Sequence, residues 1–159
     1  MTDGLLSWLR STIEGDKADA STLPHGPWYR EGVYPQRISN AEAILIAETC
    51  TNPSWRPDIA DHIIRHDPRD TIARCEAELA ELDAIEAIPH QRVIDDEWFS
   101  CSQARDEYGG LSCYNDARRG EPCDCGRDAF VDRMTRAKAY GYRHRSGYRP
   151  EWAPEGAAL

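Results

Sequence analysis

Apolar residues recur at helical spacing in four parts of the chain. Near the N-terminus, Leu5, Leu9 and Ile13 form such a stripe, and Asp3 before it suits a helix N-cap. The longest stripe lies in residues 68–88, where apolar residues alternate with acidic ones. Pro89 ends the helix that this stripe predicts. The predicted helices span residues 4–18, 57–66, 68–88 and 127–140.

A different pattern, rich in β-branched and aromatic residues, occupies residues 28–49. The stretch WYREGVYPQRI is typical of an extended segment, although Pro35 confines it to a sheet edge or ends it. The stretch EAILIAET, centred on Leu45, is the strongest strand pattern in the chain. We therefore predict an α+β fold in which a small antiparallel β-hairpin or sheet packs with about four helices.

The composition is that of a folded protein. The chain has 159 residues, of which 40% are hydrophobic, and this excludes an intrinsically disordered chain. No apolar run approaches the roughly 20 residues of a membrane span, and the first residues lack the pattern of a signal peptide. We therefore predict a cytoplasmic protein without membrane association. We also predict a single domain over residues 1–149 and a flexible tail over residues 150–159.

Residues 98–126 form a loop-rich segment that contains four of the six cysteines, in the pattern C-x11-C-x9-C-x-C. Cysteines in a polar loop are poorly explained as core residues, and in a reducing compartment they indicate a metal more often than disulfides. Zinc prefers four tetrahedral thiolate or imidazole ligands and commonly fastens a segment with little core of its own. We predict a structural Zn²⁺ bound by Cys101, Cys113, Cys123 and Cys125.

Several alternatives to this zinc site remain open at the level of sequence. His90 or His144 could replace one of the cysteines as a ligand. The cysteines could also be free, redox-active thiols, or they could form disulfides. A catalytic zinc would need an open coordination position and a nearby base, for which Glu121 and Asp124 are available.

A second set of polar residues lies in the stretch DIADHIIRHDP. Asp58, His62 and His66 are spaced four residues apart and share one face of the predicted helix, as half of a metal site would. Ile63 follows His62, so the stretch lacks the glutamate of the H-E-x-x-H motif. The alternative is a structural role, with a solvated His62 and with His66 donating to a carbonyl freed at the helix end.

The segment 133–149 has no acidic residue and interleaves cations with aromatic rings. Arginine and lysine can bind phosphates and tyrosine can stack on unpaired bases, so the segment is a candidate nucleic-acid-binding surface. The net charge of −9 argues against nonspecific coating of DNA, and the segment could instead lie on the acidic region 67–97. The residues concerned are Arg133, Arg136, Lys138, Arg143, Arg145, Arg149, Tyr140 and Tyr142.

Four stretches together resemble an uncharacterised family of small proteins from actinobacteria and their phages, a domain of unknown function. They are WLR in the first predicted helix, DIADHIIRHDPRDTIARCEAEL, the loop with WFSCS and CDCGRD, and AYGYRHRSGYRPEW. The resemblance covers most of the chain, and H-I-x-R-H-D-P and Y-R-x-E-W are its most specific parts. It implies an intracellular accessory protein, with phage-encoded origin as one context, and it assigns no catalytic residue.

These observations predict a non-enzymatic binding module in which a structural zinc fixes the orientation of a loop. The expected partner is a protein, from the host if the chain is a viral protein that acts in the host cytoplasm. One alternative is a nucleic-acid-binding protein that uses the segment 133–149. The other is a metal-dependent enzyme that uses Asp58, His62 and His66.

Overall fold

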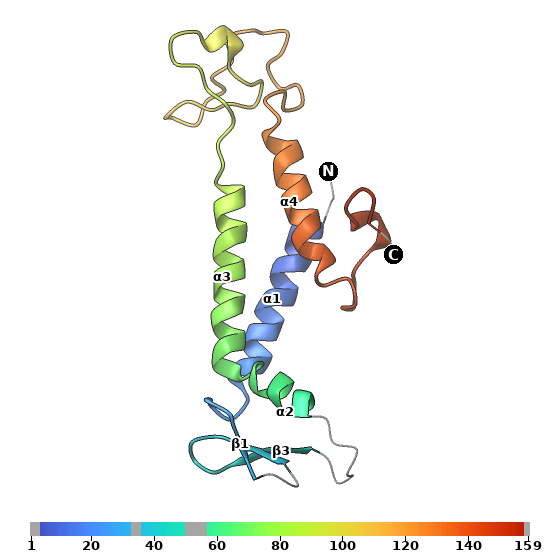
Figure 1. The fold of residues 1–159 in the computed structure, drawn as a ribbon. Helices are drawn as coiled ribbons and strands as arrows, with labels where there is room; N and C mark the ends of the chain where they lie inside the picture. The colour runs from blue at the N-terminus through green and yellow to red at the C-terminus, as the bar shows by residue number, and fades with distance from the viewer. Residues whose placement is uncertain (1–3, 33–35, 50–56, 158–159) are drawn as a thin grey trace. The chain divides into compact units, whose positions relative to one another are not determined.

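The protein is described by a computed structural model that covers residues 4–32, 36–49 and 57–157. Within these residues it has four α-helices and a three-stranded antiparallel sheet, which confirms the predicted α+β class (Figure 1). The elements are α1 (Leu5–Ser21), β1 (Tyr29–Glu31), β2 (Gln36–Ser39), β3 (Leu45–Thr49), α2 (Pro57–Ile64), α3 (Pro68–Glu86), η1 (Glu97–Phe99), α4 (Arg127–Tyr140) and η2 (Pro150–Trp152), where η denotes a 3₁₀-helix.

The chain divides into two compact units. The first unit comprises Met1–Leu9 together with Glu81–Leu159, and the second comprises Arg10–Ala80. Helices α1 and α3 each contribute residues to both units because the divisions fall inside them.

The second unit contains the sheet, whose strand order is β1-β2-β3. Strand β2 is the central strand, and a register shift between Ile38 and Ser39 bends its pairing with β3. The apolar side of the sheet packs against α2 around a small core of Trp28, Ile38 and Ala60. The predicted strand break at Pro35 lies outside the described residues.

The junction between α2 and α3 follows from the Asp67-Pro68 pair. The Asp67 carboxylate accepts a hydrogen bond of 3.0 Å from the backbone N–H of Asp70, as an N-cap residue does. Pro68 occupies the first helical position, where its missing N–H costs nothing. Asp67 also lies against Gly26, where an added Cβ would come within 2.6 Å of its Oδ2 atom, so a larger residue is excluded there.

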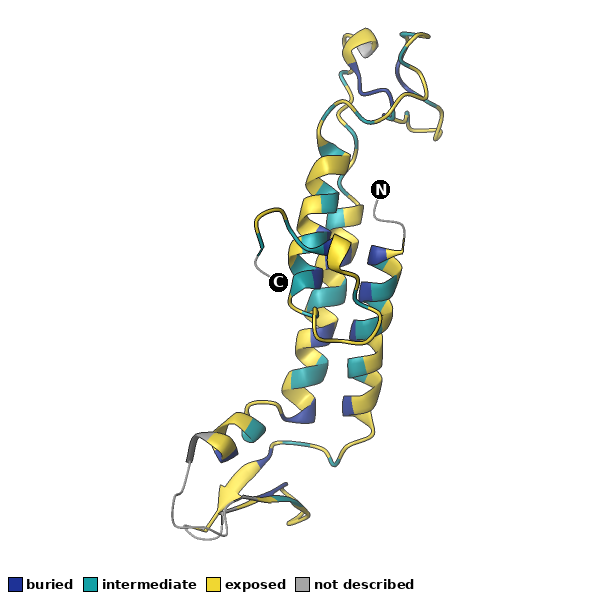
Figure 2. Ribbon diagram, turned by 90° about the vertical axis from the view of Figure 1, so that its right-hand side faces the viewer, coloured by how far each residue is buried: buried dark blue, intermediate teal, exposed yellow. Residues whose placement is uncertain are grey.

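The helical part of the first unit consists of the first turns of α1, the last turns of α3, and α4. Leu5, Leu9 and Leu82 have no exposed surface, and the buried Ala139 of α4 belongs to the same unit (Figure 2). Burying aliphatic side chains of this size contributes roughly 1.5–3 kcal/mol each. The apolar stripes of α1 and α3 are therefore buried in this unit, whereas α4 buries Thr135 and Ala139 and leaves Phe130 and Met134 exposed.

The C-terminal segment packs on α1 through aromatic rings. Trp8, Tyr148 and Trp152 form a cluster of three rings, in which the Trp8 centroid lies 5.7 Å from Tyr148 and 5.2 Å from Trp152. The Trp8 indole N–H also donates to the carbonyl of Ser146 at 3.0 Å. Gly147 has φ = 84°, and a Cβ there would meet the Trp8 ring at 2.8 Å, so this turn requires glycine. Residues 150–159, for which the sequence suggests a flexible tail, thus include η2 and the buried Trp152.

Residues 87–126, which we call the loop lobe, join α3 to α4 within the first unit. Their regular structure comprises η1 and a bridge between Arg105 and Leu111 that closes a tight turn. Asp106 holds this turn because its carboxylate accepts the backbone N–H groups of Tyr108 and Gly110. The buried residues of the lobe are small: Ser100, Cys101, Ser102, Ala104, Ser112 and Cys113. Such a lobe has too little apolar core to hold itself together.

Candidate metal centre

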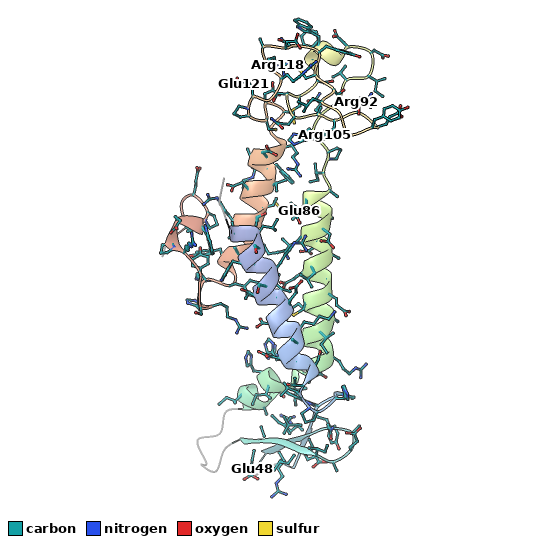
Figure 3. All side chains as sticks on the ribbon, turned by 180° about the vertical axis from the view of Figure 1, so that it is seen from behind. Glu48, Glu86, Arg92, Arg105, Arg118 and Glu121 are labelled. Atoms are coloured by element: carbon teal, nitrogen blue, oxygen red, sulfur yellow. The ribbon has the colours of Figure 1, made fainter. Side chains whose placement is uncertain are left out.

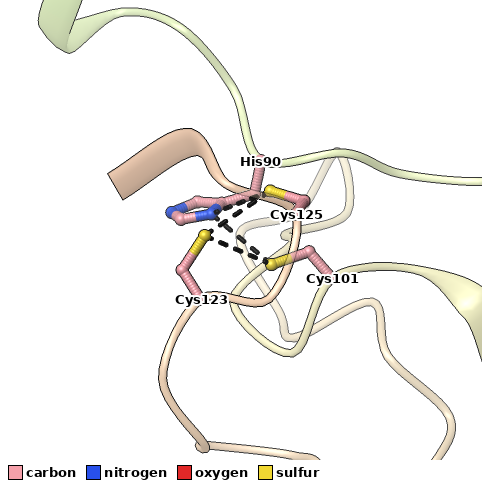
Figure 4. Close-up of side chains that lie close together, drawn as sticks. All are labelled: His90, Cys101, Cys123 and Cys125. Atoms are coloured by element: carbon pink, nitrogen blue, oxygen red, sulfur yellow. Dashed lines mark hydrogen bonds between the residues drawn. The ribbon is translucent and has the colours of Figure 1, made fainter. Parts of the chain in front are cut away.

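Four side chains at the base of the loop lobe converge on one point. The ligand atoms are His90 Nδ1 and the Sγ atoms of Cys101, Cys123 and Cys125, and they all lie within 4.8 Å of one another (Figure 4). Cys101 is buried and the other three are partly buried. The sulfur atoms are too far apart for disulfides, and these cysteines are free.

The distances between the ligand atoms match a tetrahedral zinc site. With Zn–S of about 2.3 Å and Zn–N of about 2.0 Å, a regular tetrahedron places sulfur atoms about 3.8 Å apart and sulfur and nitrogen about 3.5 Å apart. The Cys101–Cys123 and Cys123–Cys125 sulfur pairs are separated by 3.9 Å and 3.5 Å. His90 Nδ1 lies 3.6 Å from Cys101 Sγ and 3.8 Å from Cys125 Sγ. These four distances are close to those of a tetrahedral site, so the cluster could hold a metal ion such as zinc.

The chain brings these ligands together from three places. His90 follows the end of α3, and Cys123 and Cys125 immediately precede α4. Cys101 is placed beside His90 by a backbone hydrogen bond of 2.9 Å from its N–H to the carbonyl of Gln91. The centre is thus built where the chain leaves one helix and enters another, with a long loop in between.

Backbone N–H groups point at the sulfur atoms, as they do around bound thiolates. Gln91 N–H donates to Cys125 Sγ and Gln103 N–H donates to Cys101 Sγ, each at 3.5 Å. Burial acts to raise the pKa of the Cys123 thiol, but hydrogen bonds from the Asp128 backbone and from the Cys125 and His90 side chains lower it to about 6. Burial also raises the pKa of the Cys101 thiol. The thiolate is the form that binds zinc, so Cys123 is prepared for coordination at neutral pH.

Asp124, between two of the cysteines, is bound by the loop lobe itself. Its carboxylate forms an ion pair with Arg118 and accepts a hydrogen bond from the backbone N–H of Ser102. The side-chain hydrogen bond from Arg118 lowers the pKa of Asp124 to about 2. A carboxylate that is held ionised in this way is a weak base, which disfavours the catalytic role that the sequence allowed for Asp124.

The other side of the His90 ring faces the first turn of α4. His90 Nε2 lies 3.6 Å from the Oδ1 atom of Asp128. Zinc-bound histidines commonly present their second ring nitrogen to a carboxylate, which orients the ring and fixes the tautomer. Arg127, next in the chain, donates to the carbonyls of Glu86 and Ile88 and so ties the start of α4 to the end of α3. Asp128 is not among the sequence-predicted site residues, and its only sequence signal is its place two residues after C-x-C-G.

We expect Asp128→Ala to weaken zinc binding about tenfold, because loss of a carboxylate behind a histidine ligand typically costs about 10- to 100-fold in affinity. The measurement is competition with a chromophoric chelator on purified protein. Asp132→Ala is the matched control, because Asp132 lies on the same helix but pairs with Arg136 instead. Equal zinc affinities for the two variants would show that Asp128 does not orient His90.

The structure places one predicted ligand elsewhere and adds another. Cys113 is fully buried, but its Sγ faces the carbonyl of Asn115 at 3.9 Å and is not part of the four-ligand group. Arg119 fixes this position by donating to the Cys113 carbonyl. His90, which the sequence offers only as a replacement for a cysteine, takes the fourth position. His144, the other such candidate, is exposed and is not part of the group either.

The predicted second polar site lies in α2 and just beyond its end. The rings of His62 and His66 are 4.6 Å apart, and Arg74 approaches the Nδ1 atom of His66 to 3.5 Å. Burial, and then the positive charges of His62, Arg74 and Arg65, lower the pKa of His66. The Asp58 side chain lies outside the described residues, and among those described no third metal-ligand atom joins the two histidines. A second metal site here stays a prediction.

The cations of the segment 133–149 contact groups of the protein itself. Arg136 pairs with Asp132, and Lys138 pairs with Glu81 at the end of α3. The contact between Lys138 and Glu81 is of the kind expected if the basic segment lies on the acidic region. Three further arginines lie over aromatic rings, in the pairs Arg133–Phe130, Arg143–Tyr140 and Arg149–Trp152. The partners of Tyr142 and Arg145 lie within the protein as well. Nucleic-acid binding by these residues stays a prediction.

A cavity of about 760 Å³ opens in the first unit next to Asp128. Its charged lining includes Arg127, Asp128, Asp132 and Arg136, which form ion pairs with one another. The cavity therefore presents polar groups that are already paired.

No helix among the described residues has the length and apolar character needed to cross a membrane. The model of the family of unknown function DUF6221 matches residues 2–154, nearly the whole chain. No curated protein and no solved structure shows significant similarity to the chain.

Proposed function

The chain belongs to the family of unknown function DUF6221, and we propose that it is a non-enzymatic binding module held in shape by a structural zinc ion. The proposed ligands are His90, Cys101, Cys123 and Cys125. The observation that carries the proposal is the near-tetrahedral arrangement of one nitrogen and three sulfur atoms, described above.

The ligand set supports a structural role for the metal. Structural zinc sites have four protein ligands, whereas catalytic sites keep one position open for water or substrate. In the proposed site, protein atoms would fill all four positions. The neighbouring Asp124 is bound to Arg118 and is a poor general base. Both features favour a structural zinc site over a catalytic one.

The zinc would act at the point where the loop lobe begins and ends. His90 lies at its start, Cys101 in its first half, and Cys123 and Cys125 at its end. Because the lobe buries only small residues, little apolar surface stabilises it, and metal binding would supply the missing free energy. The same ion would hold the C-terminal end of α3 beside the N-terminus of α4.

The partner in this proposal is another protein. A lobe of loops fixed by a metal presents backbone turns and exposed side chains in a defined arrangement, as binding surfaces on rigid scaffolds do. The resemblance to proteins from actinobacteria and their phages suggests a host protein as partner and the host cytoplasm as compartment. Both belong to the proposal.

Purified protein is expected to contain one zinc ion per chain, measured by elemental analysis together with protein concentration. Replacement of zinc by Co²⁺ should produce sulfur-to-cobalt charge-transfer absorption and the visible bands of a tetrahedral site with three sulfurs and one nitrogen. A metal-free protein whose loop-lobe amides stay protected from hydrogen exchange would refute the structural zinc. Two metal ions per chain would instead indicate a second metal site at His62 and His66.

A further inference from the structure

The loop lobe exposes an unusual set of large apolar side chains. Among the described residues, the four most exposed large hydrophobic side chains all belong to this lobe, and Trp98 is also more than half exposed. Their exposed fractions range from 54% to 89%. Exposed aromatic rings in this number mark interaction sites more often than free surface. The residues are Ile94, Trp98, Phe99, Tyr108 and Tyr114.

Arginine side chains of the lobe hold these aromatic positions in place from within. Arg118 donates to the carbonyl of Trp98 at 3.0 Å, and its neighbour Arg119 donates to the carbonyl of Cys113, next to Tyr114. Arg105 donates to the carbonyl of Gly109 in the turn that carries Tyr108 (Figure 3). Three arginines of the lobe therefore fix its backbone, and the aromatic rings remain outside.

Asp124 and Asp116 pair with these arginines, but four other acidic residues of the lobe show the opposite pattern. Asp95, Asp96 and Glu107 are exposed and lie next to the aromatic positions in the chain, and Glu121 is exposed as well. Among the described residues, these four carboxylates have no ion-pair partner. The outer surface of the lobe thus combines exposed aromatic faces with unpaired carboxylates.

We propose that the loop lobe binds a basic protein segment, rich in arginine and lysine, on the surface formed by these aromatic and acidic side chains. A guanidinium or ammonium group can lie over an aromatic face while pairing with a carboxylate, so both features favour the same ligand. Phosphate-bearing ligands such as nucleic acids are repelled by the same carboxylates. This inference rests on the proposed function, because zinc would fix the lobe that carries the surface.

The test uses the full, zinc-loaded, ¹⁵N-labelled protein and a defined peptide, acetyl-(Gly-Arg-Gly-Lys)₃-amide. We expect titration to shift the Trp98 indole N–H signal and the amide signals of residues 94–116. Neither the acidic peptide acetyl-(Gly-Glu-Gly-Asp)₃-amide nor a twelve-nucleotide oligothymidine should produce these shifts. Binding of the oligonucleotide in place of the basic peptide, or peptide shifts spread over both units, would overturn the proposal.

Two pairs of matched variants separate specific binding from general attraction to an acidic protein. Trp98→Ala with Phe99→Ala should weaken peptide binding about fivefold, whereas Leu45→Ala, at a position with the same exposed fraction as Trp98, should not. Asp95→Asn with Glu107→Gln should weaken it more than Glu14→Gln with Asp19→Asn, which removes the same charge from exposed positions of the second unit.

Equal effects within each pair would show that the lobe is not the binding surface. The zinc content of every variant is measured in parallel. A wild-type protein without zinc counts against the proposed function, whereas zinc-loaded variants that bind the peptide as the wild type does count against this surface alone.

Discussion

Cys101→Ser is expected to abolish zinc binding and unfold the loop lobe, whereas Cys113→Ser should leave one zinc ion per chain. Both cysteines are fully buried in the same lobe, so the two substitutions are similar in size and setting. Only Cys101 contributes a sulfur atom to the four-ligand group. Loss of a ligand should lower zinc affinity by more than about 100-fold, because changes in the surrounding residues alone cost about 10- to 100-fold.

The two variants, Cys101→Ser and Cys113→Ser, are compared by the zinc content of the purified proteins and by hydrogen exchange of the amides in residues 90–126. His90→Ala should behave like Cys101→Ser, since the imidazole completes the site. If Cys113→Ser loses its zinc and His90→Ala retains it, the ligand set is the four cysteines of the sequence-based prediction. Serine at position 113 places a hydroxyl in a buried position, so a moderate loss of stability with zinc retained agrees with the structure.

Trp152→Ala is expected to lower the free energy of unfolding of the first unit by about 3–5 kcal/mol, the usual cost of removing a buried aromatic side chain. Trp152 has 3% of its surface exposed and contacts Trp8 and Tyr148. Its loss would open a cavity against α1 and release the segment that follows α4. The change should be largest for the aromatic near-ultraviolet circular dichroism signal, which reports packing around tryptophan.

Urea unfolding of the zinc-loaded protein provides the measurement, and Trp98→Ala is the control. Trp98 is more than half exposed, so its replacement should change stability by less than about 0.5 kcal/mol. Should Trp152→Ala be as stable as the control, the C-terminal segment would be loosely attached, in keeping with the flexible tail that the sequence suggests.

The two experiments address opposite ends of the first unit. The proposed zinc ligands lie where α4 begins, and the aromatic contacts of Trp152 follow where it has ended. A binding lobe of loops is useful only if its base is held, and the proposed ion would hold it while α4 is fixed from its other side by the C-terminal segment.

The sequence determined the secondary structure of this protein closely. The helix predicted at residues 68–88 from apolar periodicity and Pro89 spans Pro68–Glu86, and the one predicted at 127–140 spans Arg127–Tyr140, because helix propensity and termination are local properties. The sequence placed the strands only within residues 28–49. Their register depends on how neighbouring strands pair, which the structure shows. The sequence also predicted a metal site in this loop, from cysteines that its polar composition could not otherwise explain, and the structure places three of them in a group that could hold a metal ion.

Which side chains gather into the candidate ligand group was decided by the tertiary structure. Cys113 and His90 both lie near the other cysteines in the chain, and sequence spacing does not say which side chain turns inwards. A backbone hydrogen bond from Cys101 to Gln91 brings His90 into the group, while Arg119 holds Cys113 in a separate buried position. Coordination depends on positions within a few tenths of an ångström, which arise from long-range contacts that local sequence does not encode.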